Sequence, residues 1–212
     1  RIIVFALMFF CMTMQIEAQT LSEEEVTAKM YQAFELNKAG KKAEALELFL
    51  IVGENTKQQR NEGERQVYVC SQTMACQCYE LLGRYQEGYL LGKSLLQGKL
   101  NDEERKDVGH LYAMNGYMYA CDFIKRDERG RADYKRGREL ISEILPYSDG
   151  QVKEYAETKI PLSWYFEGAQ YAMTQSYDEA LSSYEKALNG FRDLGRVSEE
   201  VDVLSGIASV KA

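Results

Sequence analysis

Proline and histidine are nearly absent from this chain of 212 residues, which contains two prolines and one histidine. Apolar residues nevertheless make up 45% of it. A disordered chain has too few apolar side chains to form a core, so this composition excludes extensive disorder and is typical of a packed helical protein. No serine, cysteine or carboxylate pattern accompanies the single histidine, His110. We therefore predict that His110 neither catalyses a reaction nor binds a metal.

Motifs of catalysis and cofactor binding are also missing. The sequence has no glycine-rich phosphate loop, no HExxH zinc motif and no nucleophile elbow. We therefore predict that the protein is not an enzyme and that it binds no cofactor and no metal.

Cysteines are few and unsuitably spaced. Cys11 belongs to the apolar N-terminal segment, which leaves Cys70, Cys76, Cys78 and Cys121. On a helix Cys76 and Cys78 would point roughly 200° apart, so they cannot bind one metal together. Their spacing is not that of a redox CxxC motif either. We predict buried thiols, which behave as small apolar side chains. A disulfide from Cys121 to a cysteine of the preceding first helix is the alternative, since export would place these thiols in an oxidising compartment.

The net charge of −7 predicts that nucleic acid is not a partner, because an acidic chain repels phosphate. One segment, 125–138, holds seven basic residues, but Asp127, Glu128 and Asp133 lie among them. We interpret this segment as a solvated helix face of mixed charge rather than an anion site.

The N-terminal segment has the composition of a secretory signal peptide. Arg1 is followed by an apolar run over 2–14, and Ala18 precedes a polar stretch. The run is too short for a comfortable transmembrane helix. We predict a signal peptide over 1–18 with cleavage after Ala18, and an uncleaved anchor as the alternative. The protein would then be exported to the periplasm or the cell surface.

The most informative pattern lies in 164–187. Two sets of residues there have helical spacing: Trp164, Gly168 and Tyr171 in the first set, and Tyr177, Ala180, Leu181, Tyr184 and Ala187 in the second. Ser176 and Asp178 lie between the sets and suit a short turn and a helix N-cap. The small residues allow two helices to approach closely, and the aromatic residues fill the space around that contact.

The pattern recurs along the chain. A second copy has the same intervals, at Cys76, Tyr79, Gly83, Tyr85, Gly88, Gly92 and Leu95. A copy nearer the N-terminus fits the same grid at Ala33, Leu36, Gly40, Ala45, Phe49 and Val52. A weaker copy has Gly116 and Tyr119 in its first helix and 134–145 as its second. Gly206 occupies the small-residue position of a fifth first helix.

This repeated helix–turn–helix pattern resembles the tetratricopeptide repeat (TPR) family, in its exported bacterial form. The resemblance implies an all-α fold, a right-handed superhelical solenoid of antiparallel helix pairs, with about four pairs plus a terminal helix. The copies depart from the family in length, because Ala33 to Cys76 is 43 residues against about 34 in the standard unit. The family's late proline is also missing from most copies, and Pro146 is the only candidate.

We therefore expect a repeat domain over 19–212, with repeats at 22–60, 61–100, 101–147 and 150–195 and a partial repeat at 197–212. The expected helices are 22–38, 42–58, 62–82, 86–98, 102–125, 130–145, 150–174, 178–193 and 197–211. Pro161 lies inside the seventh, which should kink or break near Ile160. The last helix has an apolar face, so either it caps the array itself or the chain is the opening part of a longer protein.

The resemblance also implies a binding surface, because first helices of this family line a concave groove that holds a peptide or a helix. The positions of this sequence that correspond to the family's groove-lining face are the candidate peptide-binding residues Phe34, Thr73, Gln77, His110, Tyr117, Tyr165, Ala169 and Met173. Some family members clamp a partner's C-terminal carboxylate with Lys and Asn, but Met30 and Phe34 occupy the corresponding positions here. A groove for an apolar or amphipathic segment fits better. The alternative is that these side chains only pack against neighbouring helices.

Two functions follow from the resemblance. The first is an exported, non-catalytic scaffold that binds another protein through its concave face. The second is the N-terminal sensory or regulatory region of a larger protein, such as a sensor kinase, a transcription regulator or a caspase-like peptidase. A membrane would be involved only through an uncleaved signal or a further segment downstream.

Overall fold

The computed structural model describes residues 21–125 and 132–212, and this part of the chain is entirely helical. It contains nine α-helices, one 3-10 turn and no strand: α2 (Glu23–Lys38), α3 (Lys42–Thr56), α4 (Glu62–Leu81), α5 (Tyr85–Leu96), α6 (Asp102–Ile124), α7 (Tyr134–Ile144), η1 (Leu145–Tyr147), α8 (Gly150–Met173), α9 (Tyr177–Asp193) and α10 (Val197–Lys211). The all-α prediction is confirmed for these residues. The predicted signal peptide and most of the mixed-charge insert lie outside them.

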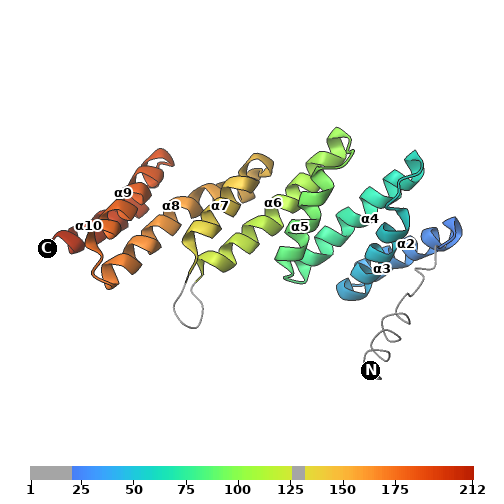
Figure 1. Ribbon diagram of the computed structural model, residues 1–212, viewed down its shortest axis with the longest axis horizontal. Coiled ribbons are helices and arrows are strands. Elements are labelled where there is room, and N and C mark those ends of the chain that lie inside the picture. Colours follow the sequence, from blue (N-terminus) through green and yellow to red (C-terminus); the bar gives the residue numbers. More distant parts are fainter. Residues whose placement is uncertain (1–20, 126–131) are drawn as a thin grey trace, which may run out of the picture.

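The helices follow one another in space in the order of the chain. Figure 1 shows an elongated row with α2 near the N-terminal end and α10 at the C-terminal end. Each helix packs mainly on the helices before and after it, and α4, α6 and α8 also contact one another in turn. We call α2, α4, α6, α8 and α10 the first helices, and α3, α5, α7 and α9 the second helices.

Capping residues explain where several first helices begin. The Ser22 hydroxyl accepts a hydrogen bond from the Glu25 amide, and the Glu25 carboxylate accepts one from the Ser22 amide in return. Asn101 and Glu104 form the same reciprocal pair at the start of α6. These pairs satisfy amide groups that the first turn of a helix leaves without partners.

One turn geometry is used four times. Its central residue has a positive φ at Gly40 (80°), Gly83 (71°), Gln175 (62°) and Gly195 (64°). The next amide donates to the carbonyl five residues earlier in each case, at 2.9 Å: Lys41 to Leu36, Arg84 to Tyr79, Ser176 to Tyr171 and Arg196 to Phe191. Glycine adopts this left-handed conformation without cost, so Gln175 is the one non-glycine residue strained within this set.

Small residues bring paired helices close together. A Cβ atom placed on Gly168 would lie 2.8 Å from the Tyr184 ring and 3.2 Å from the Ala180 carbonyl oxygen. At the same point of the second repeat the thiol of Cys76 contacts the Gly88 carbonyl oxygen at 3.8 Å. The two repeats thus place their closest helix contact at equivalent positions.

The third repeat is displaced by one helical turn. Gly137 of α7 approaches Ala120 of α6 closely in this repeat. A Cβ atom placed on Gly137 would lie 3.2 Å from the carbonyl oxygen of Ala120. The sequence pattern predicted this contact at Gly116 instead. A Cβ atom placed on Gly116 would contact the side chains of Ile144 on α7 and Tyr89 on α5. The connection from α6 to α7 spans nine residues, whereas the turns at Gly40, Gly83 and Gln175 span three. This longer connection shifts the pairing of α7 along α6.

Glu143 on α7 fastens this helix to α5 and α6. Its carboxylate accepts hydrogen bonds from Tyr112 (2.6 Å) and Tyr89 (3.0 Å) and pairs with Lys93 at 2.7 Å. Burial raises the pKa of this carboxyl, but the three donors outweigh burial and hold the pKa below its ordinary value.

Pro161 does not end its helix, because α8 runs without a break from Gly150 to Met173. Of the two expected outcomes, a kink or a break near Ile160, the break does not occur. Proline removes one backbone hydrogen bond, but here it is buried against α9, where a Cβ placed on Gly190 would lie 2.8 Å from the proline ring. Packing against α9 therefore holds α8 in helical form.

Candidate functional site

Three of the eight candidate binding residues come together between α4 and α6. Thr73, Gln77 and His110 line one hollow of about 310 Å³. Nδ1 of His110 lies 3.0 Å from a carboxylate oxygen of Asp149, so the imidazole is held at the rim. This hollow is polar apart from the side chains of Met74 and Leu111.

Phe34 lies apart from these residues, at the N-terminal end of the array. It shares a hollow of about 260 Å³ with Met30, Tyr31 and Val67. Its ring meets the buried ring of Phe49 edge-on, with centroids 5.4 Å apart. Tyr31, which the sequence pattern did not select, is 71% exposed at the mouth of this hollow.

The remaining candidates divide between packing and exposure. Tyr117 is half-buried and stacks on the exposed Tyr155 ring, with centroids 6.3 Å apart. Tyr165 packs against Tyr184, and Ala169 packs in the same core. Met173 is 75% exposed. The eight residues are thus distributed among two hollows, a packed core and exposed positions.

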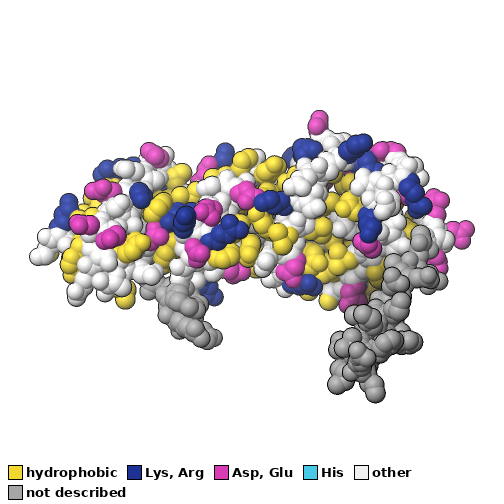
Figure 2. Space-filling model, viewed as in Figure 1, with side chains coloured by type: hydrophobic (Ala, Val, Ile, Leu, Met, Phe, Trp, Pro, Cys, Tyr) yellow, Lys and Arg dark blue, Asp and Glu magenta, His cyan; other side chains and the backbone are white. Residues whose placement is uncertain are grey.

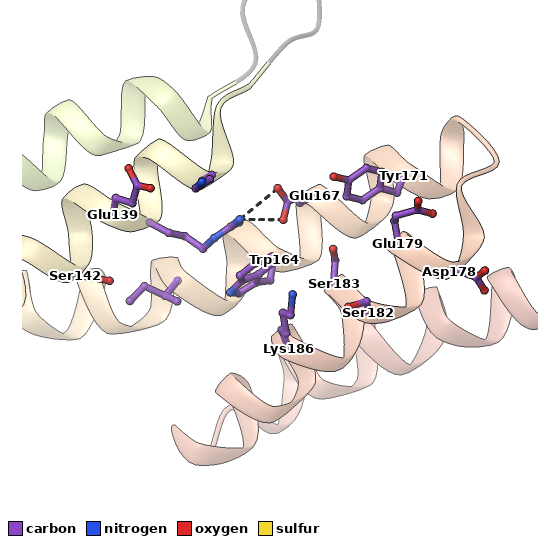
Figure 3. A pocket seen from close by; sticks show the side chains of 13 residues that line it. Glu139, Ser142, Trp164, Glu167, Tyr171, Asp178, Glu179, Ser182, Ser183 and Lys186 are labelled. Atoms are coloured by element: carbon purple, nitrogen blue, oxygen red, sulfur yellow. Dashed lines mark hydrogen bonds and ion pairs between the residues drawn. The ribbon is translucent and has the colours of Figure 1, made fainter.

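A further hollow of about 1060 Å³ lies over α8, between the second helices α7 and α9, and we call it the α7–α9 trench (Figure 3). Its lining comes from α7 (Lys135, Arg138, Glu139, Ser142), α8 (Ile160, Trp164, Glu167, Tyr171) and α9 (Asp178, Glu179, Ser182, Ser183, Lys186). Sequence reasoning missed the trench, because Trp164 and Tyr171 were interpreted only as packing residues.

Trp164 forms the centre of the trench floor between two cations. The Arg138 guanidinium lies 3.4 Å from the centre of the indole ring, and the Lys186 ammonium lies 4.2 Å from it. Figure 3 shows Trp164 and Glu167 on α8 between the two walls, with Lys186 reaching in from α9. Such cation–π contacts fix the positions of both cations above the ring.

Arg138 is the buried member of this arrangement, with 8% of its surface exposed. It donates two hydrogen bonds to Glu167, at 3.0 and 3.2 Å, and one to the hydroxyl of Ser163 at 3.3 Å. Burial lowers the pKa of Arg138, and the neighbouring Glu167 carboxylate opposes that shift. Both hydrogen bonds to Glu167 come from one guanidinium nitrogen, Nη2, and this ion pair compensates the buried charge and joins α7 to α8.

Among the described residues no group of three or more His, Cys, Asp or Glu side chains is placed to hold a metal ion. Cys70, Cys76, Cys78 and Cys121 are all free thiols in the structure, and burial raises the pKa of Cys76 to about 12. No helix within 21–125 and 132–212 combines the length and apolar character needed to span a membrane.

Comparison with known proteins adds no family to this description. No protein-family model matches the chain, and a search of the curated proteins finds no match either.

Proposed function

We propose that the chain is a TPR-like scaffold without catalytic activity, which binds another protein through its first helices. The observation that carries this proposal is the exposure of large apolar side chains on these helices. Tyr31 on α2 is 71% exposed, and Tyr155 and Met173 on α8 are 51% and 75% exposed. Figure 2 shows hydrophobic side chains at the surface along the array, between charges of both signs.

Such side chains suit a protein partner. Aromatic anchors bury a large area and lose little conformational entropy, because a tyrosine has only two side-chain torsions. They are therefore over-represented among the residues that dominate binding energy. Tyr155 is also supported from below by Tyr117, which keeps its ring at the surface.

The repeated turn supports a solenoid of the TPR type. The turn recurs at Gly40, Gly83 and Gln175, each time between a first helix and the second helix that follows it. The basic and apolar start of the sequence supports export. A sensory or regulatory region of a larger signalling protein or enzyme remains the second candidate, because the same surface would serve either role.

Site-specific photocrosslinking tests the proposal. A photoreactive amino acid is placed at Tyr31 or Tyr155, and at Ile51 of α3 or Leu90 of α5 as matched exposed controls. We expect one protein to be crosslinked from both first-helix positions and from neither control. Alanine at Tyr155 should then weaken binding of that partner by about tenfold or more, while Leu90→Ala leaves it unchanged.

The same experiment can contradict the proposal. Equal crosslinking from first-helix and control positions would mean that the first helices are not the binding surface. Unchanged affinity of Tyr31→Ala and Tyr155→Ala variants, with helix content intact, would mean the same.

A further inference from the structure

The α7–α9 trench has the shape of a peptide site. Both α7 and α9 pack on α8, but they are not packed on each other, so the outer face of α8 is open between them. The floor runs from Ile160 to Tyr171, which is about 16 Å along a helix. An extended peptide of about five residues has that length. The volume of about 1060 Å³ lies just above the range of roughly 300–1,000 Å³ for small-molecule pockets.

The trench contains polar groups that the fold itself does not use. The hydroxyl of Ser183 lines the trench although the residue is only 4% exposed, and no hydrogen bond between described residues uses it. Ser142 and Ser182 are exposed, and their hydroxyls likewise take part in no hydrogen bond between described residues. The carbonyl groups of an extended peptide would accept hydrogen bonds from these three donors.

One end of the trench is cationic. Lys186 is exposed, and its ammonium is held over Trp164. The ion pairs between described residues do not include it, whereas Arg138 in the floor is already paired with Glu167. A carboxylate entering this end would therefore meet one uncompensated positive charge.

The other end is anionic. Asp178 and Glu179 lie in the first turn of α9, and neither takes part in an ion pair between described residues. Lys135 and Glu139 face them from α7, where Glu139 pairs with Arg136. Acidic residues are also favourable at a helix N-terminus, but that effect does not explain the unpaired Lys186 held over Trp164 at the opposite end.

The spacing of the two charged ends defines the ligand. Asp178 and Lys186 are eight residues apart on α9, or about 12 Å, which an extended chain covers in three or four residues. We propose that the α7–α9 trench binds an extended peptide segment whose acidic and basic side chains are three or four residues apart. The acidic side chain pairs with Lys186, and the basic side chain pairs with Asp178 and Glu179. This site lies on a different surface from the first-helix site and does not depend on it.

The single tryptophan of the chain makes the test direct, because Trp164 contributes the only indole N–H signal of the protein. The probes are four capped peptides of six residues with a common apolar–polar filler. Their two charged positions are acid and base, acid and acid, base and base, or serine and serine. Each is titrated into the full chain labelled with nitrogen-15. We expect the acid–base peptide to shift the indole signal and to bind at least tenfold more tightly than the other three.

Variants of exposed residues then assign the contacts without disturbing the fold. Lys186→Glu should abolish the preference for the acid–base peptide and create a preference for the base–base peptide. Lys106→Glu on α6 is the matched control, because Lys106 is exposed, takes part in no ion pair between described residues and lies outside the trench, and it should leave peptide binding unchanged. Circular dichroism verifies that each variant retains its helix content.

The proposal is overturned if none of the four peptides moves the indole signal at millimolar concentration, or if all four move it equally. It is also overturned if Lys186→Glu binds the same peptide as the wild type. None of these results would affect crosslinking from Tyr31 or Tyr155, so failure here is distinguishable from failure of the first-helix site.

Discussion

Gly168→Ala tests the closest contact between α8 and α9. The added methyl group would lie 2.8–2.9 Å from two carbons of the Tyr184 ring and 3.2 Å from the backbone oxygen of Ala180. The ring cannot easily retreat, because Gly206 of α10 lies behind it: a Cβ placed there would be 3.0 Å from the ring. Tyr184 is therefore held between two glycines of different helices.

Two effects of opposite sign decide the result. Alanine is more favourable than glycine inside a helix by about 1 kcal/mol, whereas overpacking a well-filled contact costs about 1–3 kcal/mol. Because Tyr184 is 4% exposed and enclosed on both sides, we expect the upper part of that range. The net loss of stability should be about 1–2 kcal/mol. That loss lowers Tm by about 2–8 °C for a chain of this size.

Urea unfolding followed by Trp164 fluorescence measures the effect locally, because Trp164 lies one turn from Gly168 on α8. The Tyr184→Ala background supplies the control. With the ring removed, only the Ala180 contact remains, and Gly168→Ala should become stabilising by about 0.5–1 kcal/mol. A Gly168→Ala variant as stable as the wild type, with no difference between the two backgrounds, would refute the proposed contact.

Three further predictions concern the turn, the pH dependence and the N-terminus. Gln175→Gly should stabilise the protein by about 1 kcal/mol because it removes a left-handed non-glycine residue, and Gly83→Gln should destabilise it similarly; denaturation midpoints that do not move would contradict this. Glu143 has a lowered pKa in the folded state, so its contribution to stability is present above the unfolded pKa and is lost as the pH falls below about 4. The stability difference between wild type and Glu143→Gln, measured by urea unfolding, should shrink over that window, and a constant difference would argue against it. The mature chain should begin at about Gln19 and be recovered outside the cytoplasm; N-terminal sequencing of a cytosolic protein that still contains Ile2 would contradict export.

The helices could be predicted from the sequence because their signals are local. Except at α7, which begins at Tyr134 instead of 130, each helix begins and ends within two residues of its predicted bounds. Residues such as Asn101 with Glu104, or Gly83 in its turn, specify a helix end whatever surrounds them.

Features that depend on packing between repeats could not be predicted from the sequence in the same way. In the third repeat the contact with α7 lies at Ala120 and not at Gly116, because the connection between the helices is longer. A residue spacing that is assumed equal in all repeats cannot predict this difference. The tolerance of Pro161 depends on Gly190, which lies on another helix.

The trench was missed for a similar reason. Arg138 and Lys186 are 48 residues apart and look like ordinary solvated helix residues in the sequence. Only the placement of α7 and α9 on α8 brings them to 3.4 Å and 4.2 Å from the centre of one indole ring.

The order of the helices in space has a kinetic consequence. Because nearly all contacts join helices that are neighbours or next neighbours along the chain, only short loops must close before those contacts form, and the entropic barrier to folding is small. The pair α2 and α3 can therefore assemble while α8 and α9 are still being synthesised. Amide hydrogen exchange should likewise occur through openings of one or two helices at the ends of the array, well below the free energy of complete unfolding.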